Sequence, residues 1–484
     1  MPIPDTHRAL PAETIDTNPR KKPETNPGTA PEADPQTPSA YAEGVRRLVT
    51  SYRRIPRTAS VRLAKPTSNL FRARAKRTAP GLDTSGLSSV ISIDPYNRTA
   101  DVAGMCTYED LVAATLPYGL SPYVVPQLKT ITLGGAVSGL GIESASFRNG
   151  LPHESVLEMD ILTGSGEIVT ASPDKHADLY RGFPNSYGTL GYSTRLKIQL
   201  EPVKSFVTLR HLRFHRLADL ISTMDRVIET GGLDGVQVDY LDGVVFGADE
   251  SYLCLGVQTT TPGPVSDYTG QRIYYRSIQH AEGEKADRLT IHDYFWRWDT
   301  DWFWCSRAFG AQNPRLRRLW PRRYRRSSFY WKLLSYDQKF HIFDRIEKRP
   351  RERVVQDVEV PIERCAEFLE WFLANVPIEP VWLCPLRLRD SDGWPLYPLR
   401  PGRTYVNVGF WSSVPALTTP GEANRRIEAK VSELDGHKSL YSDAFYSKDE
   451  FDELYGGETY KTLKKTYDPE SRFLDLYAKA VQRR

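Results

Sequence analysis

The stretch Thr130-Ile-Thr-Leu-Gly-Gly-Ala-Val-Ser-Gly-Leu-Gly-Ile-Glu-Ser-Ala-Ser-Phe-Arg-Asn-Gly150 decides the fold of this chain. It holds five glycines, four of them within eight residues. Glycine lets the backbone approach a ligand closely and adopt conformations that other residues avoid. Backbone N–H groups in such a loop can bind a phosphate without a basic side chain, and small hydroxyl side chains add donors. The stretch therefore predicts a phosphate-binding loop, with a plain turn as the alternative.

Segments on both sides of this stretch favour the ligand-binding interpretation. Upstream, residues 61–71 read as a strand that runs into a short polar loop. Downstream, Asn185-Ser-Tyr-Gly-Thr-Leu-Gly191 holds a second glycine pair and precedes an alternating strand at 192–200. Residues 158–170 between them read as a hairpin with a Gly-Ser-Gly turn. This order of loops and strands resembles the FAD-binding domain of the vanillyl-alcohol-oxidase family, the p-cresol methylhydroxylase type.

In that family the first two loops hold the pyrophosphate of FAD. Some relatives also tether the flavin through a histidine or cysteine in these loops, but this chain has neither there. The nearest, His153, reads as a capping or surface residue, so the resemblance implies non-covalent FAD and no metal. The residues implied in cofactor binding are Lys65, Thr67, Ser68, Asn69, Thr132, Gly134, Gly135, Ser138, Gly139, Gly141, Ile142, Glu143, Ser144, Ser146, Asn149, Gly150, Gly188 and Gly191.

A Rossmann fold is the alternative for this part of the chain. The sequence Gly139-Leu-Gly-Ile-Glu-Ser144 has a serine where the third glycine of the dinucleotide fingerprint belongs. It also lies far from the N-terminus, and no clear βαβ unit surrounds it. The Rossmann interpretation is therefore the weaker of the two.

Bulk composition is that of an ordinary soluble globular protein with more than one domain. The chain has 484 residues, 26% of them charged and 40% hydrophobic, and its net charge of +4 does not argue for nucleic acid. Its five cysteines form no CxxC pair, which argues against a disulfide framework or a zinc site and fits a reducing cytoplasm. We find no signal peptide and no apolar run of about 18 residues, so no membrane span is predicted.

The residue pattern predicts an α+β protein in four segments. Residues 1–39 are rich in Pro, Thr, Glu and Asn, cannot bury enough apolar surface to order themselves, and are predicted to be disordered. Residues 40–203 form the FAD-binding domain, and residues 204–436 hold two β-α-β-β units that predict an antiparallel-sheet α+β cap domain with helices on one face. Residues 437–484 are polar and mostly helical, and in the resembled family this tail folds back onto the flavin domain.

Local signals predict the individual elements. The segment 40–54 has an apolar face typical of a packing helix, and Thr107 is a typical N-cap for a helix at 107–117. A hairpin is predicted at 90–104. In the cap, strands are predicted at 206–214, 235–241, 251–258, 354–360, 381–387 and 404–411, and helices at 217–229 and 363–375.

A narrower resemblance covers nearly the whole chain after residue 40. Thr132 to Ser144 and the segments 176–180, 188–191, Pro380–Pro385 and Leu440–Tyr446 are similar to those of the Δ24-sterol reductases. The last two lie in the cap and tail, so the resemblance is not confined to the cofactor domain. One departure is that the eukaryotic sterol enzymes have an N-terminal membrane segment, whereas this chain begins with a polar tail.

Within this branch the chain resembles the actinobacterial flavoprotein that reduces 10-methylene fatty acyl chains to 10-methyl chains. The resemblance implies NADPH as the donor, a membrane phospholipid acyl chain as the substrate, a partner methyltransferase, and a product of the tuberculostearic type. One alternative is a reductase of a sterol or isoprenoid side chain. Others are an FAD-dependent alcohol or sugar oxidase that uses O2, and a non-catalytic flavin-binding membrane adaptor.

The implied reaction defines which side chains to seek. An isolated double bond has no carbonyl group to polarise it, so it needs a strong acid, a wall that stabilises a cation, and exclusion of water. Aromatic faces stabilise cations by about 0.5–2 kcal/mol each. The candidate acids are Tyr294 and Asp443, which we prefer, then His292, Asp293, Asp301, Tyr441, Tyr446 and Glu143. The candidate wall residues are Trp296, Trp298, Trp302 and Trp304, for which plain core packing is the alternative.

A basic cluster at Arg315–Arg326 holds seven arginines interleaved with leucine, tryptophan and tyrosine. This pattern is typical of a surface that binds anionic membranes. A solvated arginine face and RNA binding are the alternatives. Together with the implied substrate, the cluster predicts a cytoplasmic protein at the inner face of the membrane.

Overall fold

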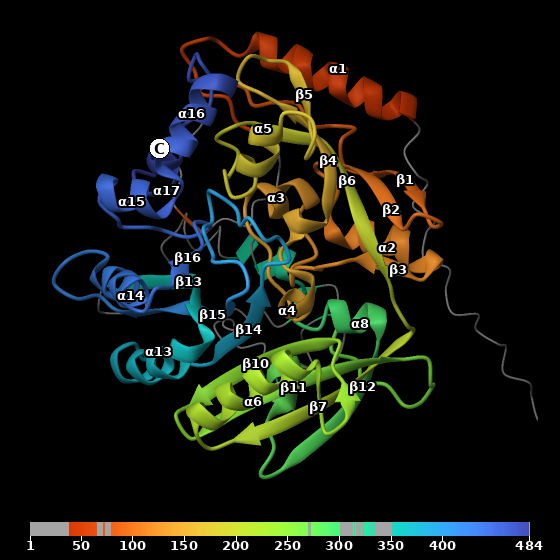
Figure 1. Cartoon of the computed structure of the whole chain (residues 1–484), viewed down its shortest axis with the longest axis vertical. Helices are drawn as coiled ribbons and strands as arrows, with labels where there is room; N and C mark the ends of the chain where they lie inside the picture. The colour runs from red at the N-terminus through yellow and green to blue at the C-terminus, as the bar shows by residue number, and fades with distance from the viewer. Residues whose placement is uncertain are drawn as a thin grey trace, which may run out of the picture.

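Two antiparallel sheets form the frame of the molecule, a smaller one in the upper part of Figure 1 and a larger one below it. The mixture of helices and antiparallel sheets confirms the predicted α+β class. The predicted tail lies outside the described residues apart from Pro38 and Ser39. The computed structural model describes residues 38–64, 71–72, 79–269, 273–300, 313, 315, 321, 324–330, 332–333 and 351–483.

The smaller sheet has six strands and belongs to the N-terminal domain. Alternation of buried and partly exposed side chains builds its strands, as Leu196, Ile198 and Leu200 show in the longest of them. The hairpins predicted at 90–104 and 158–170 are confirmed. In spatial order the strands are β1 (Val90–Asp94), β2 (Thr99–Ala103), β6 (Tyr192–Pro202), β4 (Val156–Leu162) and β5 (Ile168–Ala171), and β3 (Leu120–Pro122) pairs with β6.

Short helices surround this sheet. The predicted first helix is confirmed and packs through the buried Leu48 and Tyr52. The predicted N-cap is also confirmed, because the Thr107 hydroxyl accepts a hydrogen bond from the backbone N–H of Asp110 at 3.2 Å. These elements are α1 (Pro38–Arg54), α2 (Tyr108–Thr115), η1 (Leu116–Tyr118), η2 (Pro152–Ser155) and α5 (Ala177–Gly182).

The glycine-rich stretch is a loop in only part of its length. Thr132 caps a helix by accepting a hydrogen bond from the backbone N–H of Gly135 at 3.2 Å. Gly134 lies where this helix meets the sheet, and a Cβ there would lie 2.6 Å from the carbonyl oxygen of Gly104. The irregular part of the stretch is therefore shorter than expected, because a capped helix takes up Leu133–Ser138, and its role in phosphate binding stays a prediction. The order is α3 (Leu133–Ser138), an irregular segment at 139–145, and α4 (Ser146–Asn149).

The larger sheet joins both predicted β-α-β-β units through pairing of β10 with β14. One strand is displaced from its predicted position at 235–241, because Asp234 and Gly235 adopt positive φ in the turn of a small hairpin, β8 (Gly232–Leu233) with β9 (Val236–Gln237). In spatial order the strands are β12 (Glu284–Thr290), β7 (Phe206–Phe214), β11 (Glu250–Thr259), β10 (Tyr240–Gly247), β14 (Val381–Arg387), β15 (Thr404–Pro415), β13 (Arg351–Pro361) and β16 (His437–Lys438).

The two faces of the larger sheet differ in chemistry. On β10, Leu241 and Val245 pack into an apolar core under the cap helices. Tyr240 and Asp242 alternate with them and point to the opposite face, which packs against the N-terminal domain. Two short helices lie on this second side, α7 (Tyr274–Ile278) and α8 (Ile291–Phe295), and Figure 1 shows α4 and α8 between the sheets. The cap helices are α6 (Leu217–Thr230), α13 (Ile362–Asn375) and α14 (Glu422–Glu433).

After β16 the chain returns to the N-terminal domain. The guanidinium of Arg472 donates hydrogen bonds to the carbonyl oxygens of Ile55 at 3.0 Å and Pro56 at 2.9 Å. The ammonium of Lys464 donates to the carbonyl oxygen of Thr189 at 2.7 Å. The final elements are α15 (Lys448–Leu454), α16 (Gly457–Tyr467) and α17 (Leu476–Ala480), the blue helices of Figure 1.

Two observations bear on membrane contact. Within the part of the chain that the structure describes, no helix is both long enough and apolar enough to cross a bilayer. Of the basic cluster at 315–326, the structure describes positions 315, 321 and 324–326. The guanidinium of Arg326 binds the carboxylate of Glu109 at 2.6 Å, so this arginine is already paired within the protein.

Candidate functional site

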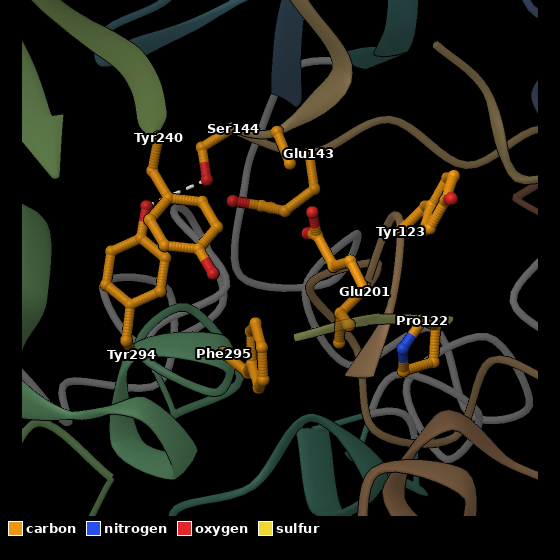
Figure 2. A pocket seen from close by; sticks show the side chains of 10 residues that line it. Pro122, Tyr123, Glu143, Ser144, Glu201, Tyr240, Tyr294 and Phe295 are labelled. Carbon is orange, nitrogen blue, oxygen red and sulfur yellow. Dashed lines mark hydrogen bonds between the residues drawn. The ribbon is translucent and has the colours of Figure 1, made fainter. Parts of the chain in front are cut away.

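A small cavity lies where the N-terminal domain meets the cap (Figure 2). Its walls come from β3 and the loop after it, from residues 143–145, from the end of β6, from the start of β10, and from α8. Tyr240, Tyr294 and Phe295 make these walls aromatic, and Glu143 and Glu201 supply two carboxyl groups. The cavity therefore combines apolar surface with acidic groups at the domain boundary.

Glu143 belongs to a buried charged cluster with Arg297 and Asp242. Arg297 Nη2 donates to Glu143 Oε1 at 2.6 Å and to Asp242 Oδ2 at 2.8 Å. Arg297 Nη1 donates to the carbonyl oxygen of Tyr294 at 2.9 Å, and the guanidinium carbon lies 4.0 Å from the centre of the Tyr294 ring. The side chain of Arg297 has no exposed surface. Glu143 comes from the N-terminal domain and the other two from the cap, so the cluster forms only across the domain boundary.

The environment of Glu143 favours its protonated form. Burial raises the pKa of this carboxyl group, Arg297 opposes the increase, and the negative charge of Asp242 adds to it. Glu143 Oε2 is buried and has no hydrogen-bond partner among the described residues. Leaving such an oxygen charged and unpaired is unfavourable. A carboxyl group with a raised pKa at the edge of a cavity has the properties of a general acid.

Among the predicted acids of the aromatic stretch that the structure describes, Tyr294 alone lines the cavity. Its hydroxyl lies 2.8 Å from Ser144 Oγ, and burial raises its pKa well above the ordinary value, so it is a poor acid. His292 is exposed and 3.2 Å from Asp293, whose backbone N–H donates to the Thr290 side chain at the start of α8. The structure therefore does not bring His292 and Asp293 to the cavity, because they form the first turn of a helix. Asp301 lies outside the described residues.

The candidates from the C-terminal segment lie at other places. Asp443 is half-buried and its carboxylate is 3.4 Å from the guanidinium of Arg483. The Tyr441 hydroxyl accepts a hydrogen bond from Trp411 Nε1 at 2.9 Å, and Tyr446 is buried among the C-terminal helices. None of the three candidates Tyr441, Asp443 and Tyr446 lines the cavity. Asp443 therefore lies away from this cavity, and its role as the proton donor stays a prediction.

The predicted tryptophan wall also differs from the structure. Trp296 is 1% exposed and Trp298 is fully buried, with its ring centre 4.7 Å from that of Tyr274. Neither lines the cavity. Trp302 and Trp304 lie outside the described residues. Among the described residues, tyrosine and phenylalanine side chains form the aromatic wall of this cavity, whereas Trp296 and Trp298 fill the core.

Several polar side chains predicted to bind the cofactor hold their own segment together. Ser138 donates to a carbonyl oxygen within α3. Ser146 accepts a hydrogen bond from the backbone N–H of Glu143 at 3.1 Å. The Asn149 amide donates to Glu201 Oε1 at 3.0 Å. These bonds fix the shape of the segment. The remaining predicted polar residues, Lys65, Thr67, Ser68 and Asn69, lie outside the described residues.

The predicted glycines have two structural roles. Gly141 permits close packing, since a Cβ there would lie 2.9 Å from a proline ring, and the neighbouring Ile142 is buried in the core. Gly150, Gly188 and Gly191 have positive φ values of 68°, 72° and 149°, which other residues rarely adopt. The glycines thus allow the two loops to turn sharply beside each other.

Sequence reasoning missed Asp242, Arg297 and Tyr240. Arg297 lies among tryptophans, and the aromatic pattern directed attention to its neighbours. Asp242 is the only acidic residue of β10, a strand that is otherwise mostly apolar. An acidic residue in such a strand is rarely buried without a partner. This pattern could have indicated that Asp242 pairs with a cation. No local pattern links Arg297 to Glu143, because 154 residues separate them.

Comparison with known proteins bears on the cofactor and the reaction class. A family described as FAD binding domain matches residues 60–172. The Δ24-sterol reductase of Mus musculus is 25% identical over 405 residues, which cover 81% of this chain and 76% of that protein. The Arabidopsis thaliana Δ24-sterol reductase is 25% identical over 451 residues, covering 83% and 77%. Cytokinin dehydrogenase 7 of Oryza sativa subsp. japonica is 31% identical over 219 residues, covering 43% and 40%.

The protein is an FAD-dependent oxidoreductase. The residues present in this flavoenzyme fit the cofactor. Asn185 Nδ2 donates to the carbonyl oxygen of Gly139 at 2.5 Å and so joins the two glycine loops. Asn185 Oδ1 and Ser186 Oγ are buried there and have no hydrogen-bond partner among the described residues. FAD carries hydroxyl and phosphate groups that would satisfy these atoms, so Gly139, Asn185 and Ser186 are the described residues that would hold it.

His153 does not offer a covalent link to the flavin. It is fully buried, unlike the capping or surface residue that we predicted, because its ring packs against Trp394 with the ring centres 4.4 Å apart. Burial lowers its pKa to about 3, so the ring is neutral. Non-covalent binding of FAD stays a prediction for this flavoenzyme.

Proposed function

We propose that this flavoenzyme reduces an isolated carbon–carbon double bond in a lipid, with NADPH as the electron donor. The most specific substrate that we propose is a 10-methylene fatty acyl chain of a membrane phospholipid, which would become a 10-methyl chain. The observation that carries the proposal is the buried carboxyl group of Glu143, with one unpaired oxygen, at an aromatic cavity between the domains. The Δ24-sterol reductases, which are 25% identical to this chain over the aligned residues, are named for the same bond type.

The chemistry of an isolated double bond explains why such an acid is needed. Protonation of the terminal carbon of a methylene group leaves a tertiary carbocation, and a hydride then adds to the branch carbon. Bound FAD would supply that hydride after accepting one from NADPH. Without a proton donor the alkene has no electrophilic carbon, so an acid within the cavity decides whether the reaction proceeds.

Different residues at the cavity would donate the proton and shield the cation. Glu143 would deliver the proton, since its carboxyl group is the one at the cavity whose burial raises its pKa and whose second oxygen is unpaired. The other carboxyl group of the cavity, Glu201, is paired with Arg148 at 2.6 Å. The rings of Tyr240 and Phe295 would face the cationic carbon and keep water away from it.

A sterol or isoprenoid side chain is the second candidate substrate. The names of the relatives favour it, and protonation of its double bond would also give a tertiary cation. For the fatty acyl substrate, a methyltransferase acting earlier is the partner that would supply the methylene group. Separate assays with a 10-methylene phospholipid and with a sterol that carries a side-chain double bond distinguish the two substrates.

We expect the two half-reactions to be separable under anaerobic conditions. NADPH should bleach the flavin absorbance, and 10-methylene phospholipid should restore it. In D2O the product should carry deuterium in the methyl branch at every turnover, because that hydrogen comes from an acid that exchanges with solvent. Deuterated NADPH should label the branch carbon only. A methyl branch without solvent deuterium would refute protonation as the first step. Flavin that stays bleached after 10-methylene phospholipid is added would refute this lipid as the substrate.

We also propose that the basic cluster at 315–326 holds the enzyme on anionic membranes at the inner face. Arg326 is paired with Glu109, so the test uses other arginines of the cluster. Replacing Arg317, Arg322 and Arg323 with glutamate should weaken binding to anionic vesicles by about 1 kcal/mol or more per residue. Neutral vesicles are the control for charge, and wild-type protein that ignores anionic vesicles at low salt would refute this contact.

A further inference from the structure

We propose that Asp242, by sharing the single positive charge of Arg297, keeps a proton on Glu143 at neutral pH, so that the cluster is a loaded proton donor before substrate arrives. Glu143 is the catalytic residue, and Asp242 and Arg297 are positioning residues that act through it. The use of this proton rests on the proposed function. The presence of the proton does not, because it can be observed in the protein without substrate.

The hydrogen bonds of the cluster distinguish its two carboxyl groups. Both accept from the same nitrogen, Arg297 Nη2, at 2.6 Å and 2.8 Å. Asp242 Oδ2 also accepts from Trp382 Nε1 at 3.4 Å. Glu143 Oε2 has no partner among the described residues. A buried carboxylate oxygen without a donor is stabilised by protonation, so the geometry points to Glu143 as the group that carries the proton.

The charge balance indicates that the cluster holds one proton. If both carboxyl groups were ionised, the cluster would carry one net negative charge in a fully buried place, which is unfavourable. The other guanidinium at the cavity, that of Arg148, is paired with Glu201. Burial keeps the neighbouring titratable groups neutral by raising the pKa of each thiol and phenol and by lowering that of the imidazole to about 3. These groups are Tyr240, Tyr274, Tyr294, Cys254, Cys384 and His211.

A single proton therefore neutralises the cluster and is the one available to the substrate. Transfer breaks the O–H bond of Glu143 and forms a C–H bond at the terminal alkene carbon. The resulting carboxylate keeps its 2.6 Å bond to Arg297, which stabilises the charge that it gains. Bound FAD would supply the hydride that quenches the carbocation, and a proton from water would reload Glu143.

Infrared spectroscopy of the flavin-loaded protein tests the loaded proton directly. Wild-type protein at neutral pH should show a carboxylic-acid C=O band that shifts in D2O and is absent from Glu143→Gln. In Asp242→Asn this band should vanish at neutral pH, because Arg297 then neutralises Glu143 alone. It should return when the pH is lowered by about one to three units. Asp242→Glu keeps the charge and should keep the band.

Glu201→Gln is the matched control, because it removes the other carboxyl group of the cavity and should leave the band unchanged. A band that persists unaltered in Asp242→Asn would overturn the role of Asp242. Absence of any Glu143-dependent band in wild-type protein would overturn the inference as a whole, and this comparison holds even if Asp242→Asn fails to fold. A band present in a protein that does not reduce alkenes would refute the proposed function and still support the loaded proton.

Discussion

Replacing Glu143 with glutamine should slow alkene reduction by about 10²–10⁴-fold, while reduction of the flavin by NADPH continues at its normal rate. Glutamine keeps the size of the side chain and can still accept a hydrogen bond from Arg297. It has no acidic proton at the cavity. Anaerobic stopped-flow absorbance, which follows flavin bleaching and flavin recovery separately, measures the two rates in one experiment.

Asp443→Asn is the control for this substitution. It removes a carboxylate of the C-terminal segment that is paired with Arg483 and does not line the cavity, so both half-reactions should keep their rates. Glu143→Asp retains the acid one carbon further from the cavity and should recover part of the activity. Equal loss of both half-reactions in Glu143→Gln would indicate a general defect, and unchanged alkene reduction would exclude Glu143 as the acid.

Replacing Arg297 with methionine should destabilise the folded protein by about 3–5 kcal/mol, because it leaves two buried carboxyl groups without their cation. The loss should depend on pH. Burial already raises the pKa of Glu143 above its unfolded value, and removal of the guanidinium raises it further. The folded variant therefore holds protons more tightly than the unfolded chain. Its stability is retained below the unfolded pKa and falls as the pH rises towards the folded pKa.

Thermal unfolding of wild type and variant across the acidic to alkaline range measures this effect. Arg403→Met is the matched control, because Arg403 pairs with Glu363 and Asp435 at the surface of the cap. Exposed pairs contribute about 0–1 kcal/mol, so this control should change little at any pH. An Arg297→Met protein as stable as the control at alkaline pH would show that the cluster does not hold two carboxyl groups against one cation.

Local signals were sufficient for much of the fold. Thr107 and its neighbours predicted a capped helix, and alternation predicted β6 and the two hairpins, because each depends on residues close in sequence. The glycine stretch was predicted less well. The same glycines that permit a loop also permit the close approach of a helix to a sheet, and the Thr132 cap favours a helix over Leu133–Ser138.

The site was less predictable than the fold. The cofactor loops were recognised by their glycines, and Glu143 was among the candidate acids. Its partners were not, since Asp242 and Arg297 come from a strand and a turn that reach Glu143 only through tertiary packing. Trp296 and Trp298 were predicted to line the site, but they are buried in the core. Tryptophan is suited both to stabilising a cation and to filling a core, so its residue type alone does not distinguish the two roles.

Whether Glu143 is protonated depends on contact across the domain boundary, because Arg297 and Asp242 reach Glu143 from the cap. One carboxyl group of the cluster comes from the N-terminal domain, and the other, with the guanidinium, comes from the cap. Any separation of the two domains large enough to admit a lipid would break the 2.6 Å bond between Glu143 and Arg297. Exposure to water would remove the burial that raises the pKa of Glu143, so the group would lose its proton at neutral pH, whereas burial in the assembled cluster would keep it.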